Sequence, residues 1–193
     1  MFYRKMKNKN RYEIIILGRG GQGAKTSAEL LVQAALLEGK QIQAFPEFGP
    51  ERSGAPVRSF VRISTEPIRT HETVTDPDCV LVLDDTLLEK KGAFDNLTEG
   101  KLVIVNSKKE ENEIREMIGK EVVVSVVDAS GMSKKIIGQE RPNTVILGRF
   151  VSVSKVVEMD SLIAVFSAKY ESKIGKEMSD KNVEAIRAAY NEE

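Results

Sequence analysis

A short aliphatic run that leads through a group of glycines into a helix most constrains what this chain can fold into. Residues 14–17 read Ile-Ile-Ile-Leu, which is typical of a strand buried on both faces of a parallel sheet. The glycines within residues 18–23 permit a tight turn and the close approach of another group. A helical pattern then covers residues 22–38, and the start of a helix carries unpaired amides and a positive dipole end. The sequence therefore predicts a strand–turn–helix unit that can receive an anion.

The glycine spacing matches known nucleotide-binding patterns only in part. The glycines that satisfy the dinucleotide pattern G-x-G-x-x-G are Gly18, Gly20 and Gly23. The next expected strand, at residues 40–45, does not end in the acidic residue that would hold a ribose hydroxyl. The P-loop pattern also fails, because Ala24 separates Gly23 from Lys25. Neither NAD nor ATP is well supported, and a turn that serves only close packing is the alternative.

Length and charge exclude several classes of protein. A chain of 193 residues is expected to form one domain, here residues 12–193, after a basic and flexible N-terminal arm at residues 1–11. Lys plus Arg and Asp plus Glu both number 29, so bulk charge does not favour nucleic acid. No apolar run is long enough for a membrane span or a signal peptide. We therefore expect a cytoplasmic protein that binds neither nucleic acid nor membranes.

Single cysteine and histidine residues limit the chemistry that the chain can perform alone. Cys79 cannot form an internal disulfide or hold an iron–sulfur cluster without other cysteines, and its apolar surroundings predict a buried side chain. His71 stands in a polar run and is expected at the surface. Zinc sites built from several histidines or cysteines are excluded.

A proline- and glycine-rich segment follows the second expected strand. Residues 46–56 contain three prolines and two glycines, which no regular element tolerates. They also include charged and aromatic side chains, which favours a shaped functional loop over a plain connector. Such a loop should emerge at the carboxyl end of its strand, beside the glycine turn, where open α/β sheets bind ligands.

The remaining pattern predicts an α/β fold. Residues 57–64 alternate and then turn back at residues 65–69, which indicates a β-hairpin at the sheet edge, with Arg58 and Arg62 on a solvated face. The expected elements that follow are strands at 79–83, 101–106 and 121–127, and helices at 109–118, 144–156, 158–167 and 180–190. Their alternation predicts a three-layer, Rossmann-like sheet, mostly parallel with one antiparallel hairpin and with helices on both faces.

Three sites along this part of the chain favour helix capping. Asp84 and Asp85 end a strand, where carboxylates can bind metal or act in acid–base chemistry, but a helix cap is the preferred interpretation. Asn143 and Ser179 are expected as N-caps of the helices that follow them.

Four ordered blocks of the sequence resemble the gamma subunits of 2-oxoacid:ferredoxin oxidoreductases, above all those of pyruvate:ferredoxin oxidoreductase (pyruvate synthase). The blocks read GRGGQGAKTSAELL, QAFPEFGPERSGAPVRSFVRIS, PDCVLVLDD and NTVILG. The resemblance extends from about Glu13 to Tyr190 and so covers nearly the whole chain.

This resemblance implies a role as one subunit of a larger enzyme. The complete enzyme converts a 2-oxoacid, coenzyme A and oxidised ferredoxin to acyl-CoA, CO2 and reduced ferredoxin. It implies a heterotetramer with alpha, beta and delta type subunits, which hold thiamine diphosphate, Mg²⁺ and [4Fe-4S] clusters. The gamma subunit carries no cluster, in agreement with the single Cys79, and is thought to help form the coenzyme A site.

The anion-receptive turn fits coenzyme A, which carries a pyrophosphate and a 3′-phosphate. We expect no catalytic residue and no metal ligand in this chain. The residues expected to form its coenzyme A or interface surface are Arg19, Gly20, Gly21, Gln22, Gly23, Lys25, Glu51, Arg52, Ser53 and Gly54. Two alternatives stay open: a stand-alone dinucleotide-binding oxidoreductase and a ligand-free α/β adaptor subunit.

Overall fold

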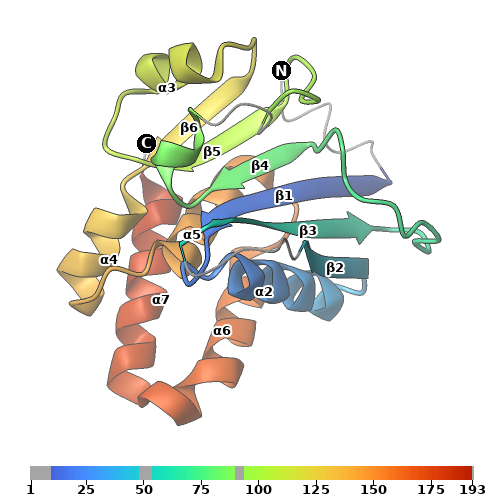
Figure 1. Ribbon diagram of the computed structural model, residues 1–193. Helices are drawn as coiled ribbons and strands as arrows, with labels where there is room; N and C mark the ends of the chain where they lie inside the picture. The colour runs from blue at the N-terminus through green and yellow to red at the C-terminus, as the bar shows by residue number, and fades with distance from the viewer. Residues whose placement is uncertain (1–9, 48–53, 90–93, 193) are drawn as a thin grey trace.

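The computed structural model describes residues 10–47, 54–89 and 94–192, within which six strands form one sheet (Figure 1). The strands are β1 (Arg11–Arg19), β2 (Gln41–Glu47), β3 (Pro56–Ser64), β4 (Cys79–Val82), β5 (Leu102–Asn106) and β6 (Val123–Val127). Their order is β2-β3-β1-β4-β5-β6. The pairings β1–β4, β4–β5 and β5–β6 are parallel, whereas β3 pairs antiparallel with both β1 and β2. The prediction of a mostly parallel sheet with an antiparallel hairpin is confirmed.

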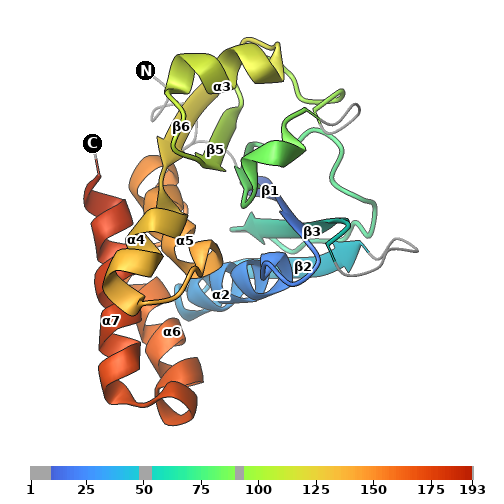
Figure 2. The same cartoon turned by 60° about the vertical axis from the view of Figure 1, so that its left-hand side comes forward.

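Helices cover the two faces of this sheet unequally (Figure 2). The helices are α2 (Ala24–Leu37), α3 (Glu111–Ile118), α4 (Ala129–Ile137), α5 (Pro142–Ser154), α6 (Met159–Ile174) and α7 (Lys176–Asn191), with a 3-10 turn η1 (Asp85–Leu87). One apolar cluster joins the sheet to α2, α5, α6 and α7, and another joins its opposite face to α3 and η1. The predicted three-layer α/β architecture is therefore confirmed.

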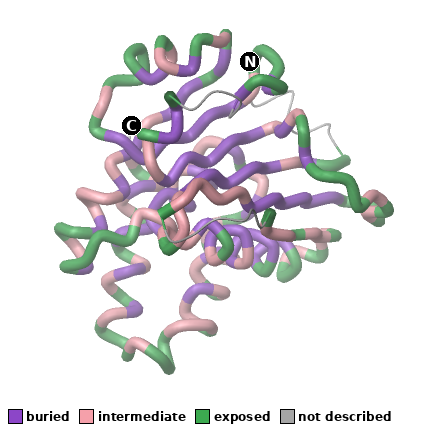
Figure 3. The backbone as a smooth tube through the Cα atoms, in the orientation of Figure 1, coloured by how far each residue is buried: buried purple, intermediate pink, exposed green. Residues whose placement is uncertain are grey.

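The central strand β1 shows why this sequence forms a buried sheet. Successive side chains of a strand point to opposite faces, so Ile14 and Ile16 enter one apolar cluster while Ile15 and Leu17 enter the other. All four side chains are buried, as the purple course of β1 shows in Figure 3. The interpretation of residues 14–17 as a strand buried on both faces is confirmed.

The antiparallel hairpin differs in its position from the sequence-based expectation. Its partner is the preceding strand β2, and residues 65–69 do not return as a paired strand. β3 consequently lies inside the sheet, between β2 and β1. β2 continues through Pro46 to Glu47, which an edge strand tolerates because its outer amides need no partner. The first strand also begins at Arg11, one residue inside the expected N-terminal arm; residues 1–9 lie outside the described residues.

The expectation that both arginines of β3 lie on a solvated face is wrong for Arg62. Its side chain is 3% exposed, and its Nε donates to Glu13 Oε1 at 2.7 Å. The same guanidinium donates to Gln43 Oε1 at 2.8 Å and to the carbonyl of Glu72 at 2.6 Å. Arg58 retains the predicted exposure, at 43%. The two residues differ because the Arg62 guanidinium is enclosed by Glu13, Gln43 and the Glu72 carbonyl.

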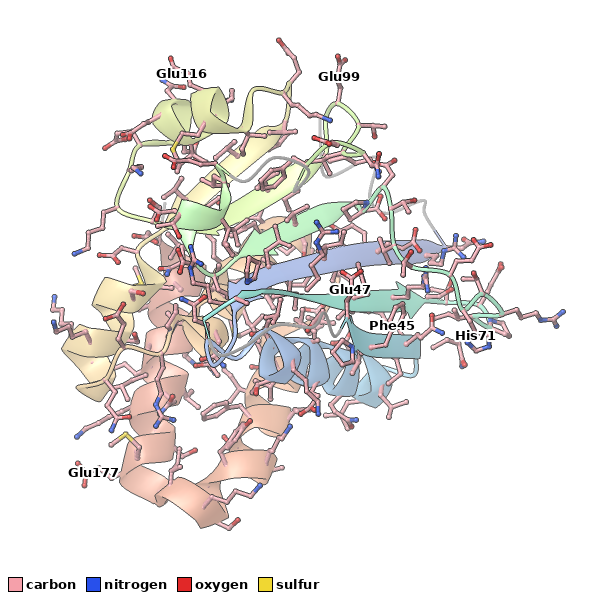
Figure 4. All side chains as sticks on the ribbon, viewed as in Figure 1. Phe45, Glu47, His71, Glu99, Glu116 and Glu177 are labelled. Carbon is pink, nitrogen blue, oxygen red and sulfur yellow. The ribbon has the colours of Figure 1, made fainter. Side chains whose placement is uncertain are left out.

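The C-terminal helices follow the predicted order, but their starts differ. α7 begins at Lys176, after Gly175 with a φ of 81°. Ser179 therefore lies within the helix, and the prediction that it caps the helix is wrong. Its hydroxyl is buried and has no hydrogen-bond partner among the described residues. The α6–α7 hairpin extends away from the sheet, with Glu177 at its far end (Figure 4).

The single cysteine and histidine occupy the predicted environments. Cys79 is fully buried in β4, and burial raises the pKa of its thiol well above the usual value. His71 is exposed and lies beyond the end of β3 (Figure 4), with its Nδ1 3.5 Å from Gln43 Nε2. In the part of the chain that the structure describes, no helix is both long and apolar enough to cross a membrane.

Candidate functional site

A cleft of about 1080 Å³ lies at the carboxyl ends of the parallel strands. The segments that follow β1, β4, β5 and β6 all reach it, and they meet the loop before α5 and one side of the α6–α7 hairpin. The described residues that line it are 21–23, 26, 83–85, 106–109, 128, 130, 140–144, 166, 170, 174 and 182. Ligands of open α/β sheets bind at this edge, so the cleft is the candidate site.

The glycine turn forms one wall of the cleft and starts α2. Gly21 and Gly23 have φ angles of 96° and 85°, in the left-handed region that glycine adopts without steric cost. Gly23 is the N-cap residue of α2, and no side chain among the described residues caps this helix. A side chain at Gly23 would also collide with Asn143, whose Nδ2 lies 2.6 Å from the position of a Cβ atom. Both the backbone and the contact across the cleft therefore require glycine here.

The side chain of Arg19 belongs to a hydrogen-bond network beside the cleft. Its Nε donates to Asp84 Oδ2 at 3.0 Å, and its Nη2 donates to Thr86 Oγ1 at 2.7 Å. Gln22 joins the network by donating to Asp84 Oδ2 at 2.8 Å and accepting from the Arg19 amide at 2.6 Å. Arg19 is absent from the described lining of the cleft. Its guanidinium thus holds β1 to the start of η1, and we assign it a positioning role.

The environment of Asp84 favours the charged carboxylate. Partial burial alone would raise its pKa, but hydrogen bonds from Thr86 and Gln22, together with the charge of Arg19, lower the pKa overall. Asp84 also caps η1 by accepting from the Thr86 amide at 3.1 Å. Asp85 accepts from Ser107 Oγ at 2.6 Å. These contacts agree with the capping interpretation, and within residues 10–47, 54–89 and 94–192 no acidic, histidine or cysteine cluster could hold a metal ion.

The end of the β2–β3 loop lies beside the glycine turn, as its sequence predicted. The Gly20 amide donates to the Ala55 carbonyl at 2.9 Å, and Arg19 Nη1 donates to the Gly54 carbonyl at 3.2 Å. The residues expected from the middle of this loop, Glu51, Arg52 and Ser53, lie outside the described residues. Their contribution to the site stays a prediction.

The described residues of the predicted site therefore do not all lie in the cleft. Among the described ones, Gly21, Gln22 and Gly23 line the cleft, whereas Gly20 and Gly54 lie at the base of the loop. Lys25 points to solvent with a 66% exposed side chain, and its Nζ lies 3.8 Å from Glu29 Oε1 in the expected i,i+4 pair.

Sequence reasoning missed several residues of the cleft. Asn143 and Thr144 lie in the first turn of α5, where Arg141 occupies the N-cap position that had been expected for Asn143. Phe166 and Tyr170 line the far side of the cleft from α6, with their ring centroids 5.0 Å apart. Asn143 and Thr144 belong to the block NTVILG, which carried the family resemblance. That block could have indicated that Asn143 and Thr144 are functional, but its sequence does not show that they lie beside the glycine turn.

The topology disfavours a dinucleotide site of the usual kind. In such a site, the strand after the first helix lies beside the first strand and ends in an acidic residue. Here β3 lies between β1 and β2. Glu47, at the end of β2, has its carboxylate 3.9 Å from Arg58 Nε on the sheet edge. No ribose-binding carboxylate is therefore supplied by β2.

Comparison with known proteins identifies the family. The model of the family described as pyruvate ferredoxin/flavodoxin oxidoreductase matches residues 13–192. The chain belongs to this family. The pyruvate synthase subunit PorC of Methanothermobacter thermautotrophicus is 42% identical over 93% of this chain and 94% of its own. The pyruvate/ketoisovalerate oxidoreductases common subunit gamma of Thermococcus litoralis is 41% identical over 92% of this chain and 95% of its own.

Structural similarity agrees with this assignment to the pyruvate ferredoxin/flavodoxin oxidoreductase family. The crystal structure of pyruvate oxidoreductase subunit PORC from Thermotoga maritima matches with a TM-score of 0.85 and 36% identity. The match covers 95% of this chain and 97% of that one. The resemblance inferred from four sequence blocks is confirmed, and the relatives are gamma subunits of pyruvate and other 2-oxoacid oxidoreductases. The chain is accordingly an enzyme subunit of this class.

Proposed function

We propose that this chain works as the gamma subunit of a multi-subunit oxidoreductase that converts pyruvate, coenzyme A and oxidised ferredoxin to acetyl-CoA, CO2 and reduced ferredoxin. Family membership over residues 13–192 is the observation that carries this proposal. Alpha, beta and delta type subunits supply the thiamine diphosphate, Mg²⁺ and [4Fe-4S] clusters. The chain itself has a structural role in the complex and forms part of the surface that binds coenzyme A.

The cleft supports the coenzyme A role through its size and its polar wall. Its volume of about 1080 Å³ is slightly above the usual range of ligand pockets, roughly 300–1000 Å³. The glycine turn and the start of α2 offer amides to a phosphate group, and Lys108 and Lys109 line the same cleft. The rings of Phe166 and Tyr170 provide an apolar surface opposite these polar groups. This combination suits a long ligand that has both phosphates and an aromatic base.

A ligand-free adaptor role is the second candidate. The observation that favours it is the hydrogen bonding of Arg19, whose guanidinium donates to Asp84, Thr86 and the Gly54 carbonyl. Such a network fixes the base of the β2–β3 loop and would serve a contact with a partner subunit equally well. The two roles make different predictions for ligand affinity.

A bulky side chain in the glycine turn distinguishes these roles. We expect Gly21→Leu to raise the apparent KM for coenzyme A about tenfold or more in the assembled enzyme, with a smaller change in kcat, as expected for lost ligand binding. No atom lies within 4 Å of the position of a Cβ on Gly21, so the new side chain can enter the cleft. Steady-state assays of 2-oxoacid-dependent dye reduction measure both constants.

Gly39→Leu is the matched control for this experiment. Gly39 has a φ of 74° and equally open surroundings, but it lies at the end of α2 and outside the described lining of the cleft. Both variants carry similar backbone strain, so a loss of affinity restricted to Gly21→Leu supports the coenzyme A role. An unchanged KM in an intact complex would favour the adaptor role.

A further inference from the structure

We propose that the ion pair between Glu29 of α2 and Lys169 of α6 positions one wall of the cleft, and that this position sets the affinity for coenzyme A. Lys169 is a positioning residue, because it is absent from the described lining of the cleft and acts through the aromatic side chains beside it. The inference rests on the proposed function in taking coenzyme A as the ligand. It gives a role to two residues that lie 140 positions apart in the sequence.

The wall in question, here called the α6 wall, consists of Phe166, Tyr170 and Ile174. These residues all line the cleft, and their spacing of four places them on one face of the helix. The glycine turn and Thr26 of α2 line the cleft as well. A change in the angle between α6 and α2 would therefore change the width of the space between them.

Apolar burial holds the second half of α6 only weakly. The buried residues of this helix are Leu162 and Phe166, and none after Phe166 is buried. The helix ends at Ile174, where Gly175, with a φ of 81°, leads directly into α7. Segments with few buried apolar contacts open most easily. A polar contact with a neighbouring helix can consequently determine where this half of α6 lies.

The Glu29–Lys169 pair provides such a contact. Lys169 Nζ donates to Glu29 Oε2 at 2.7 Å. This hydrogen bond lowers the pKa of Glu29 and raises the pKa of Lys169, so both side chains stay charged near neutral pH. Lys169 Nζ also lies 5.6 Å from the centroid of the Tyr170 ring, within the range of a cation–π interaction. The same ammonium group thus contacts both α2 and the α6 wall.

The start of α6 is held by a separate set of contacts. The Glu158 amide donates to Glu38 Oε1 at 2.7 Å, and Lys40 Nζ donates to Glu38 Oε2 at 2.6 Å. Both Glu38 and Lys40 directly follow α2 or its last glycine. Loss of the Glu29–Lys169 pair would leave these contacts in place and release only the second half of α6. The pair therefore acts on the angle of the helix and not on its attachment.

Lys169→Glu tests this role because it replaces attraction by repulsion. Glu29 would then face a second carboxylate and keep only Lys25, at 3.8 Å, among the cations paired with it in the described chain. In the assembled enzyme we expect the KM for coenzyme A to rise about three- to fivefold with little change in kcat, in keeping with a partly exposed ion pair that affects binding. Steady-state dye reduction measures both constants.

Exchange of the two charges provides the rescue. In Glu29→Lys/Lys169→Glu the pair is restored in reverse, so we expect a KM within about twofold of the wild-type value. Lys181→Glu is the control, since Lys181 pairs with Glu177 within α7 at 2.8 Å and is absent from the described lining of the cleft. An equal rise of KM in Lys181→Glu, or no recovery in the exchanged pair, would overturn the proposal.

A distance measurement on the full-length chain tests the positioning without any ligand. Cys79 is fully buried, so spin labels can be directed to Gln33→Cys in α2 and Ser172→Cys in α6, both at exposed positions. We expect pulsed electron paramagnetic resonance to give a longer and broader distance distribution after Lys169→Glu, and the wild-type distribution after the charge exchange. An unchanged distribution in Lys169→Glu would overturn the proposal.

The two readouts separate this inference from the proposed function. A raised KM in Gly21→Leu, together with a wild-type KM in Lys169→Glu, would retain the coenzyme A role and reject the influence of the ion pair on affinity. A changed distance distribution in Lys169→Glu, with an unchanged KM in both variants, would support the positioning of α6 and reject coenzyme A as the ligand of the cleft.

Discussion

Replacing Gly148 with alanine is expected to destabilise the protein by about 1–3 kcal/mol, the range typical of overpacked cores. Gly148 lies within α5 where that helix crosses α7. A Cβ atom at this position would stand 2.0 Å from the Ile186 carbonyl oxygen and 3.1 Å from the Tyr190 amide nitrogen. Both atoms belong to the backbone of α7, so no side-chain rotation can relieve the contact. The two helices would have to move apart.

Overpacking and helix propensity predict opposite changes in the stability of Gly148→Ala. Helix propensity alone favours alanine over glycine by about 1 kcal/mol, so it predicts the opposite result. Ala168→Gly at an exposed position of the neighbouring helix α6 measures the propensity effect directly. Urea unfolding followed by circular dichroism gives both free energies. A Gly148→Ala variant that is as stable as the wild type or more so would refute the close crossing of α5 and α7.

Replacing Arg62 with methionine is expected to lower the free energy of unfolding by about 3 kcal/mol, because breaking the buried ion pair leaves Glu13 with only a more distant and more exposed cation, Arg11, whose Nε lies 3.7 Å away among the described residues. Glu13 would lose its 2.7 Å contact with the guanidinium, while its side chain remains only 17% exposed. Gln43 and the Glu72 carbonyl would each lose a donor. Urea unfolding at neutral pH measures the loss.

Arg58→Met is the matched control because Arg58 lies on the same face of the same strand. Its side chain is 43% exposed and stands 3.9 Å from Glu47, which is 48% exposed. Such surface pairs contribute about 0–1 kcal/mol. We also expect the double variant Glu13→Met/Arg62→Met to regain much of the lost stability, since apolar side chains can replace a buried ion pair. Equal effects of Arg58→Met and Arg62→Met would contradict the buried pair.

The parts of the fold that depend on local pattern could be predicted from the sequence. The aliphatic residues 14–17 and the glycines after them determine a strand, a turn and a helix through contacts close along the chain. The single Cys79 lies in a continuous apolar run, and its burial followed from that run alone. The described end of the proline-rich loop, at Gly54 and Ala55, lies beside the glycine turn as predicted, because both segments follow the carboxyl ends of strands.

The parts that depend on distant contacts could not be predicted in the same way. Arg62 alternates like a solvent-facing residue, and its burial depends on contacts with Glu13, Gln43 and the segment around Glu72, which lie far from it in the sequence. Ser179 has the sequence context of an N-cap, but Gly175 lets α7 begin earlier. The approach of Asn143 and Thr144 to the glycine turn likewise results from the packing of α2 and α5 on one face of the sheet.

Anaerobic purification of the chain from its native host, through a small affinity tag, tests the central claim most directly. We expect larger partner subunits with thiamine diphosphate and iron–sulfur clusters to copurify. We also expect the preparation to reduce a dye only when both a 2-oxoacid and coenzyme A are present. Pyruvate should be the best substrate. A lone 21.4 kDa chain without this activity would contradict the assignment to a multi-subunit 2-oxoacid oxidoreductase.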